Sequence, residues 1–174
     1  MPCEDRVWAA SAGAGEVNGV EYRVRRGRVS LALGVLMFVA SCGDLEVVTA
    51  SYATLDEAIA AEAVDRGWLP RGLPRGSHDI REAHDLDSNR RWGLFEFPQA
   101  EAPTLQALLD HEVPFGGQRV NPPRRIEWWP VLLRGSLDHD QLIATGLRAY
   151  QARDGDLVFA VNWKQGRAYY WSRE

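Results

Sequence analysis

The longest apolar stretch of the chain runs from Val29 to Ala40. The basic run Arg25–Arg28 precedes it, and Ser41 and Cys42 follow it. A membrane-spanning helix takes about 20 residues, so this stretch is too short to cross a bilayer. It is apolar on every side, whereas a helix of a soluble core has one apolar stripe. A basic, an apolar and a small-residue region in this order predict a secretory signal.

The end of this signal, Val39-Ala40-Ser41-Cys42, resembles a bacterial lipobox. The resemblance implies cleavage before Cys42 and attachment of acyl chains to its sulfur and its new amino group. Two lipid signals suffice for stable anchoring. We therefore expect a protein of the bacterial cell envelope that is held on a membrane through Cys42. Because Gly43 follows instead of the Asp that marks inner-membrane retention, we expect the outer membrane, facing the periplasm, if the envelope is Gram-negative.

The signal divides the chain into a leader (1–23), a signal peptide (24–41), a lipidated tether (42–45) and a single head domain (46–174). The leader places acids and glycines where a signal should start, so we interpret it as the result of a misplaced start codon or as a disordered extension. Residues 42–174 carry a net charge of −5, which argues against a nucleic-acid partner. They contain no cysteine after Cys42, which excludes disulfides and cysteine-based metal sites from the head.

Hydrophobic and polar positions predict the elements of the first half of the head. β-Branched and aromatic residues predict a strand over 45–53. Thr54 and Glu57 form a capping box that starts a helix, and Gly67 is placed to end it. The tandem Leu-Pro-Arg-Gly sequence at 69–76 predicts a loop. Strands are expected over 80–86 and 92–97.

The second half predicts a short helix, an isolated strand, another short helix and a meander. The helix starts at Pro103 and ends before Pro114, the strand covers 126–133, and Ser136 caps the next helix, which stops at Gly146. The meander strands cover 147–152, 157–163 and 167–171, with a turn at Asp154-Gly155. Phe159, Val161 and Trp163 share one face and are expected in the core. Irregular alternation of strands and helices predicts an α+β fold: a largely antiparallel sheet, two or three short helices and a C-terminal β-meander.

Residues 67–97 carry a dense motif of tryptophan, proline and polar positions. Its members are Gly67-Trp68-Leu69-Pro70, Leu73-Pro74, Ser77, Asp79-Ile80, Glu82, Asp85-Leu86-Asp87, Asn89, Trp92, Phe95 and Phe97. This motif resembles that of small bacterial head domains of the YbbD-head type, many of which are carried by lipoproteins. The resemblance implies an architecture and a cell-envelope setting, and it implies no reaction.

The same segment offers one hypothesis for a calcium site. Asp85, Asp87, Asn89 and Glu96 have the spacing of an EF-hand loop, whose ligands are oxygen atoms. Arg90, however, stands where that loop requires glycine. The alternative, which we favour, is a solvated turn in which Asp and Asn side chains bind backbone amides.

Two further hypotheses concern histidines. His78, His84, Asp79 or Glu82 are suitable ligands for a transition metal, and His78, Glu82 and His84 alternate so that they share one face of an extended segment. Ser77 with either histidine and an aspartate suggests a hydrolase, although no nucleophile elbow surrounds it and Ser77 is also suited to cap a turn. A polar loop beside two prolines is more often plain surface.

The sequence thus favours a membrane-anchored binding or interaction module of unknown ligand over an enzyme. We assign no catalytic residue, no cofactor and no metal, and the expected partners are the membrane, through the lipid anchor, and another envelope protein. The interaction or structural motif comprises Trp68, Pro70, Pro74, Ser77, His78, Glu82, Asp85, Asp87, Asn89 and Trp92. The alternative is an envelope enzyme, hydrolytic or metal-dependent, that uses the polar cluster between His78 and Asp87.

Overall fold

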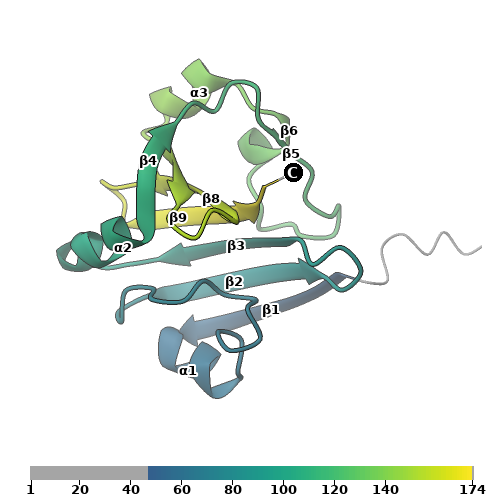
Figure 1. The fold of residues 1–174 in the computed structure, drawn as a ribbon, viewed down its shortest axis with the longest axis vertical. Helices are drawn as coiled ribbons and strands as arrows, with labels where there is room; N and C mark the ends of the chain where they lie inside the picture. The colour runs from purple at the N-terminus through teal and green to yellow at the C-terminus, as the bar shows by residue number, and fades with distance from the viewer. Residues whose placement is uncertain (1–46, 174) are drawn as a thin grey trace, which may run out of the picture. The chain divides into compact units, whose positions relative to one another are not determined.

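The computed structural model describes residues 47–173, so the predicted leader, signal peptide, lipobox and tether, with Cys42, lie outside the described residues. A seven-stranded antiparallel sheet with the strand order β1-β2-β3-β9-β8-β7-β4 forms the frame (Figure 1). Its strands are β1 (Val47–Thr54), β2 (His78–Asp85), β3 (Arg91–Glu96), β4 (Leu109–Val113), β7 (Arg148–Ala152), β8 (Leu157–Asn162) and β9 (Arg167–Ser172). A two-stranded ribbon pairs β5 (Arg119–Val120) with β6 (Gly135–Ser136).

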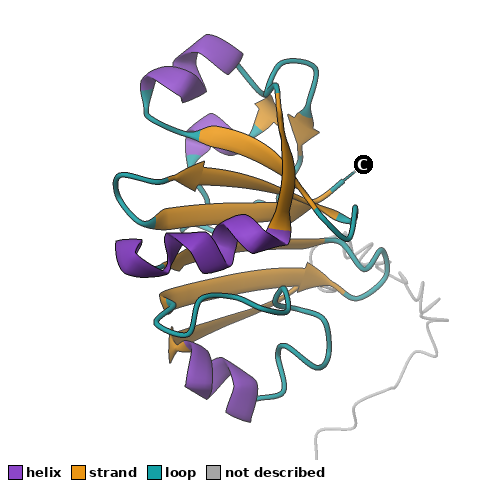
Figure 2. Ribbon diagram, turned by 60° about the vertical axis from the view of Figure 1, so that its left-hand side comes forward, coloured by secondary structure: helices purple, strands orange, loops and turns teal. Residues whose placement is uncertain are grey.

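Three short helices accompany the sheet at separate places (Figure 2). They are α1 (Leu55–Ala60), α2 (Ala102–Leu108) and α3 (His139–Ala144), with single 3-10 turns η2 (Gln99–Glu101) and η3 (Val131–Leu133). The predictions of a mostly antiparallel sheet, short helices and a C-terminal meander are confirmed, and the fold is rich in β-structure. No helix in the part of the chain that the structure describes is long and apolar enough to cross a membrane.

Each face of the sheet carries its own hydrophobic core. The first core is covered by α1, α2 and the loop that follows α1, and it contains Phe159 and Val161, with Trp163 packed against it, as the alternation predicts. The second core lies under η3 and α3 and is built around Trp129. Strand β8 is buried at all of its positions because both cores use it.

The helix expected up to Gly67 ends earlier, at Ala60. Thr54 caps it as predicted, accepting a hydrogen bond from the Glu57 amide at 3.3 Å. At the other end Glu62 takes a left-handed conformation (φ 60°), and Ala63 donates to the carbonyl of Ala58 at 3.0 Å. This is the hydrogen-bond pattern of a Schellman motif, which normally uses glycine. Gly67 (φ 77°) ends only the further turn that follows.

Three predictions for the second half are wrong in detail. The second helix stops at Leu108 because the chain then pairs with β7 as strand β4. The strand expected over 126–133 is instead a series of turns, in which the Trp129 indole donates to the carbonyl of Leu133 at 2.8 Å. Asp138, not Ser136, caps α3, since its carboxylate accepts from the Gln141 amide at 3.0 Å.

Candidate functional site

A buried acid–imidazole pair lies on β2, facing the first core. The Glu82 side chain is fully buried and that of His84 nearly so, and His84 Nδ1 lies 2.9 Å from Glu82 Oε2. The Trp68 ring stacks on the His84 ring with centroids 4.2 Å apart and planes at 13°. The Arg66 guanidinium in turn lies 5.0 Å from the centre of the Trp68 ring. Trp68 therefore covers the pair.

Burial is the largest influence on the pKa of Glu82 in this pair. It raises the pKa of Glu82, and the hydrogen bond to His84 offsets part of that rise. Burial also raises the pKa of Tyr170 well above its usual value, with the charge of Glu82 adding to the effect. The Tyr170 hydroxyl donates to the carbonyl of Trp68 at 3.0 Å, which ties the covering loop to the sheet. Glu82 Oε1 and His84 Nε2 have no hydrogen-bond partner among the described residues.

The motif of residues 67–97 is open to solvent at a small pocket of about 270 Å³. The residues that line it are Arg66, Gly67, Trp68, His84, Asp85, Leu86, Asn89 and Arg91. The Arg91 guanidinium donates to the carbonyl of Gly67 and so joins the two sides of the pocket.

The acidic run Asp85–Asn89 forms a turn that is held by its own backbone. Asp85 Oδ1 accepts hydrogen bonds from the amides of Asp87 at 3.0 Å and Ser88 at 2.9 Å. The hydrogen bond from the Ser88 amide is the main reason that the pKa of Asp85 is lowered, and the bond from the Asp87 amide adds to the effect. Glu96, the fourth expected calcium ligand, lies at the far end of β3 from this turn. The structure therefore does not bring the EF-hand-like set together.

Asp85, not Asp87, should stabilise this turn. Asp85→Ala is expected to cost about 1 kcal/mol of unfolding free energy at pH 7, as loss of a side-chain cap does elsewhere, and Asp87→Ala almost nothing. Because the folded-state pKa of Asp85 is lowered, its contribution is present above its usual pKa and lost as the pH falls through the folded value. Urea unfolding at pH 7 and pH 3 measures this. A larger loss for Asp87→Ala would contradict the assignment.

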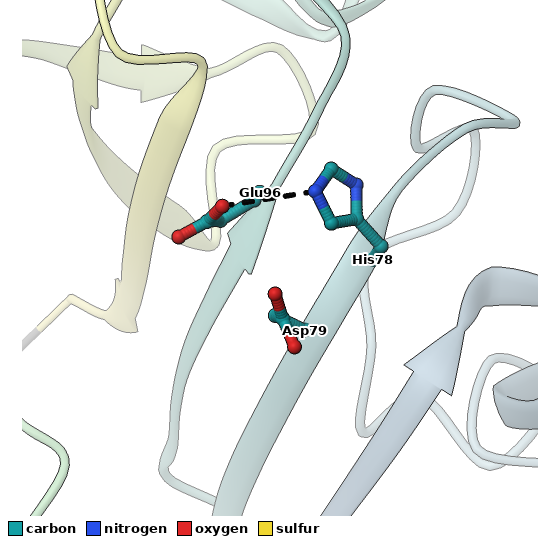
Figure 3. A group of neighbouring side chains, drawn as sticks. All are labelled: His78, Asp79 and Glu96. Carbon is teal, nitrogen blue, oxygen red and sulfur yellow. Dashed lines mark ion pairs between the residues drawn. The ribbon is translucent and has the colours of Figure 1, made fainter.

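The other predicted histidine, His78, lies apart from the buried pair. A β-bulge at Asp79 (φ 48°) shifts the register between His78 and Arg81. His78 is paired with Glu96 of β3, with Nε2 3.7 Å from Glu96 Oε2 (Figure 3). The Arg167 guanidinium holds the other oxygen of Glu96. The expectation that His78, Glu82 and His84 share one face is therefore wrong, because the inserted residue reverses the alternation.

Ser77 is buried, and its Oγ has no hydrogen-bond partner among the described residues. Its backbone makes the contacts instead: the amide donates to Pro74 and the carbonyl accepts from Leu55. Because the Ser77 hydroxyl bonds to neither nearby histidine, the Ser–His arrangement of a hydrolase is not assembled among the described residues.

The Leu-Pro-Arg-Gly tandem and Trp92 have structural positions. The buried members Leu69, Leu73, Pro70 and Pro74 point inward, while Arg71 and Arg75 are exposed and pair with surface aspartates. Trp92 is buried in the second core. These residues hold the loop and the sheet together.

Comparison with known families gives one result. Residues 46–96 match the YbbD head domain. The resemblance drawn from the motif is thus confirmed for this segment, which contains β1, β2, β3 and the buried Glu82–His84 pair. Neither the curated proteins nor the solved structures include a significant match to the chain.

The YbbD head segment also supplies one edge of the sheet, strand β1. Its sequence, VVTASYAT, contains no charged residue and no proline, and Thr49, Ser51 and Ala53 are exposed. The opposite edge, β4, carries the charged sequence Asp110-His111-Glu112 and an irregular register. Charges and bulges protect an edge from pairing with another strand. The β4 edge has both devices, and the β1 edge has neither.

Proposed function

We propose that this chain is a lipid-anchored protein of the bacterial cell envelope whose head binds an extended segment of another envelope protein along β1. The single observation that carries the binding role is the uncharged, unprotected edge of β1 opposite the protected edge of β4. Exposed edge strands recognise extended peptides by adding a strand, with backbone hydrogen bonds supplying affinity. The basic, apolar and Cys42-ending pattern supports the anchor.

A pocket beside the edge favours recognition of particular side chains. It has a volume of about 290 Å³ and is lined by Ser51, Tyr52, Ala53, Asp79, Ile80, Arg81 and Trp128. On an added strand, alternate side chains would point toward this face, where the half-buried Trp128 ring offers an apolar contact. Val48, which is 40% exposed, offers a second apolar contact on β1.

The polar residues between Ser77 and Asp85 have structural contacts, which argues for a binding role over a catalytic one. Asp85 binds turn amides, Glu82 and His84 bind each other under Trp68, and Ser77 has no histidine partner. A hydrolase needs a nucleophile, a base and an oxyanion site within mutual reach. The enzyme alternative therefore has less support than the binding module.

Photo-crosslinking in a bacterial host tests the binding edge and the kind of partner proposed for it. A crosslinking residue at Ser51 of the full chain should give an adduct with a second envelope protein, and one at the exposed Gln106 on α2 should not. Ser51→Lys places a charge on the edge and should reduce adduct formation reported from a neighbouring crosslinker at Thr49, while Gln106→Lys should not. An adduct of two copies of this chain, or none from β1, would contradict the proposed partner.

The anchor is tested in the same cells by Cys42→Ser. This change should abolish acyl labelling, move the protein out of the membrane fraction and reduce the Ser51 adduct. Unchanged membrane retention would refute the lipid anchor while leaving the binding edge to be judged by the crosslinks alone. Fractionation with the inner membrane would contradict the expected sorting to the outer membrane.

A further inference from the structure

The side chains of His78, Asp79 and Glu96 converge on one small space from β2 and β3 (Figure 3). One potential ligand atom of each lies within 4.8 Å of the others. We propose that these three residues bind a divalent transition-metal ion, with Zn²⁺ as the fitting example. Among residues 47–173 they form the one group of three such side chains this close together.

The strand pairing explains why these residues meet. His78 and Glu96 are direct cross-strand partners, and the side chains of such pairs are close neighbours. The bulge inserts Asp79 between His78 and Ile80, and its left-handed backbone (φ 48°) lets two consecutive side chains reach one ligand position. Ile80 then returns to the first core, where it is fully buried.

Contacts from outside the group orient two of the three ligands. His78 Nδ1 lies 3.0 Å from the Gly76 carbonyl, which can only accept, so Nδ1 carries a proton and Nε2, the nitrogen that faces Glu96, is the one available to a metal. The Gly76 amide is itself held by the Glu101 carboxylate, at 3.0 Å from Oε2. Metal-bound imidazoles commonly donate their other ring proton to a backbone carbonyl in this way.

Glu96 is oriented by Arg167. The guanidinium binds Oε1 of Glu96, which leaves Oε2 as the oxygen that faces His78. Ligating carboxylates are often held by such a second contact.

The donor set selects the class of ion. One imidazole nitrogen and two carboxylate oxygens suit zinc, whereas calcium takes six to eight oxygen ligands and magnesium keeps mostly water. The two carboxylates exceed the one guanidinium by a single negative charge, which favours a cation. All three side chains are at least partly exposed, so the ion has a path from solvent and room for water as a further ligand.

Isothermal titration of the purified full chain with ZnCl₂ tests the site. The wild-type chain should bind zinc saturably, and His78→Ala should weaken the affinity at least about tenfold. Asp79→Asn should also weaken it, and this change preserves the fold because asparagine tolerates the left-handed conformation. Thermal unfolding without zinc checks that each variant is folded. CaCl₂ in place of ZnCl₂ should give no saturable binding.

His111→Ala is the matched control. His111 is a surface histidine whose Nδ1 lies 2.9 Å from Asp110, so it presents an exposed imidazole–carboxylate pair of similar kind. Its replacement should leave zinc affinity unchanged, and Cys3 and Cys42 are the same in every variant. Equal zinc affinity in the wild-type chain and the folded Asp79→Asn and His78→Ala chains would overturn the proposal, as would the absence of saturable zinc binding by the wild-type chain.

Discussion

Gly93→Ala is expected to cost about 3 kcal/mol or more of unfolding free energy and to lower the thermal midpoint by at least about 10 °C. Gly93 lies in β3 directly opposite Tyr170 of β9, and a methyl group at Gly93 would overlap the Tyr170 ring. The Tyr170 ring cannot move aside, because it is fully buried and its centroid lies 5.8 Å from that of the Phe159 ring. Its hydroxyl is also held by the hydrogen bond to the Trp68 carbonyl. Thermal and urea unfolding of the full chain measure the loss.

Gly116→Ala is the control for this prediction. An added methyl group at Gly116 has only His139 nearby, at 3.9 Å, so the change should stay within about 0.5 kcal/mol. Tyr170→Leu removes the overlapping ring, and Gly93→Ala should therefore cost less in that background than in the wild type. Additive losses in this double-mutant cycle would show that the Tyr170 ring is not the reason for glycine at this position.

Local sequence patterns predicted the strands that are marked by alternating hydrophobic positions or by turn residues. The strands β2, β3 and the three of the meander alternate or are bounded by turn residues, and Asp154-Gly155 marks its turn, where Gly155 has φ 83°. Strand β4 has no such signal, since its charged sequence reads as the end of a helix. It becomes a strand only by pairing with β7, which begins 35 residues after β4 ends. That partner is a property of the tertiary fold.

The sequence indicated the polar residues of the site more readily than their grouping. Glu82 and His84 are two residues apart on one strand, so regular alternation already places them on one face. The group of His78, Asp79 and Glu96 depends on a bulge and on the register between β2 and β3. A single inserted residue moves the preceding residues of the strand to the opposite face of the sheet, and the residue type at this position does not indicate the bulge.

Trp68→Ala is expected to cost about 3 kcal/mol at pH 5, the lower end of the range for removal of a large aromatic side chain, because Trp68 is only half-buried. The loss comes from the stack on His84 and from the packing of Trp68 against the first core. Trp163→Ala is the matched control, since Trp163 is also half-buried against this core but lies on Phe97 and Tyr150. Both variants should show similar losses in urea unfolding at pH 5.

The pH dependence should separate the two tryptophans. Burial under Trp68 raises the folded-state pKa of Glu82, so the Glu82 contribution to stability is fully present below its unfolded pKa and is lost as the pH rises through the folded value. Trp68→Ala admits water to the pair and reduces this rise in pKa, so the variant loses less stability with increasing pH than the wild type does. The cost of Trp68→Ala should therefore shrink between pH 5 and pH 8, whereas the cost of Trp163→Ala should stay constant. In a Glu82→Gln background, which removes the titrating carboxyl, the cost of Trp68→Ala should also become independent of pH. If the shrinkage persists in that background, another group causes it, and Trp68 does not act as the cover of Glu82.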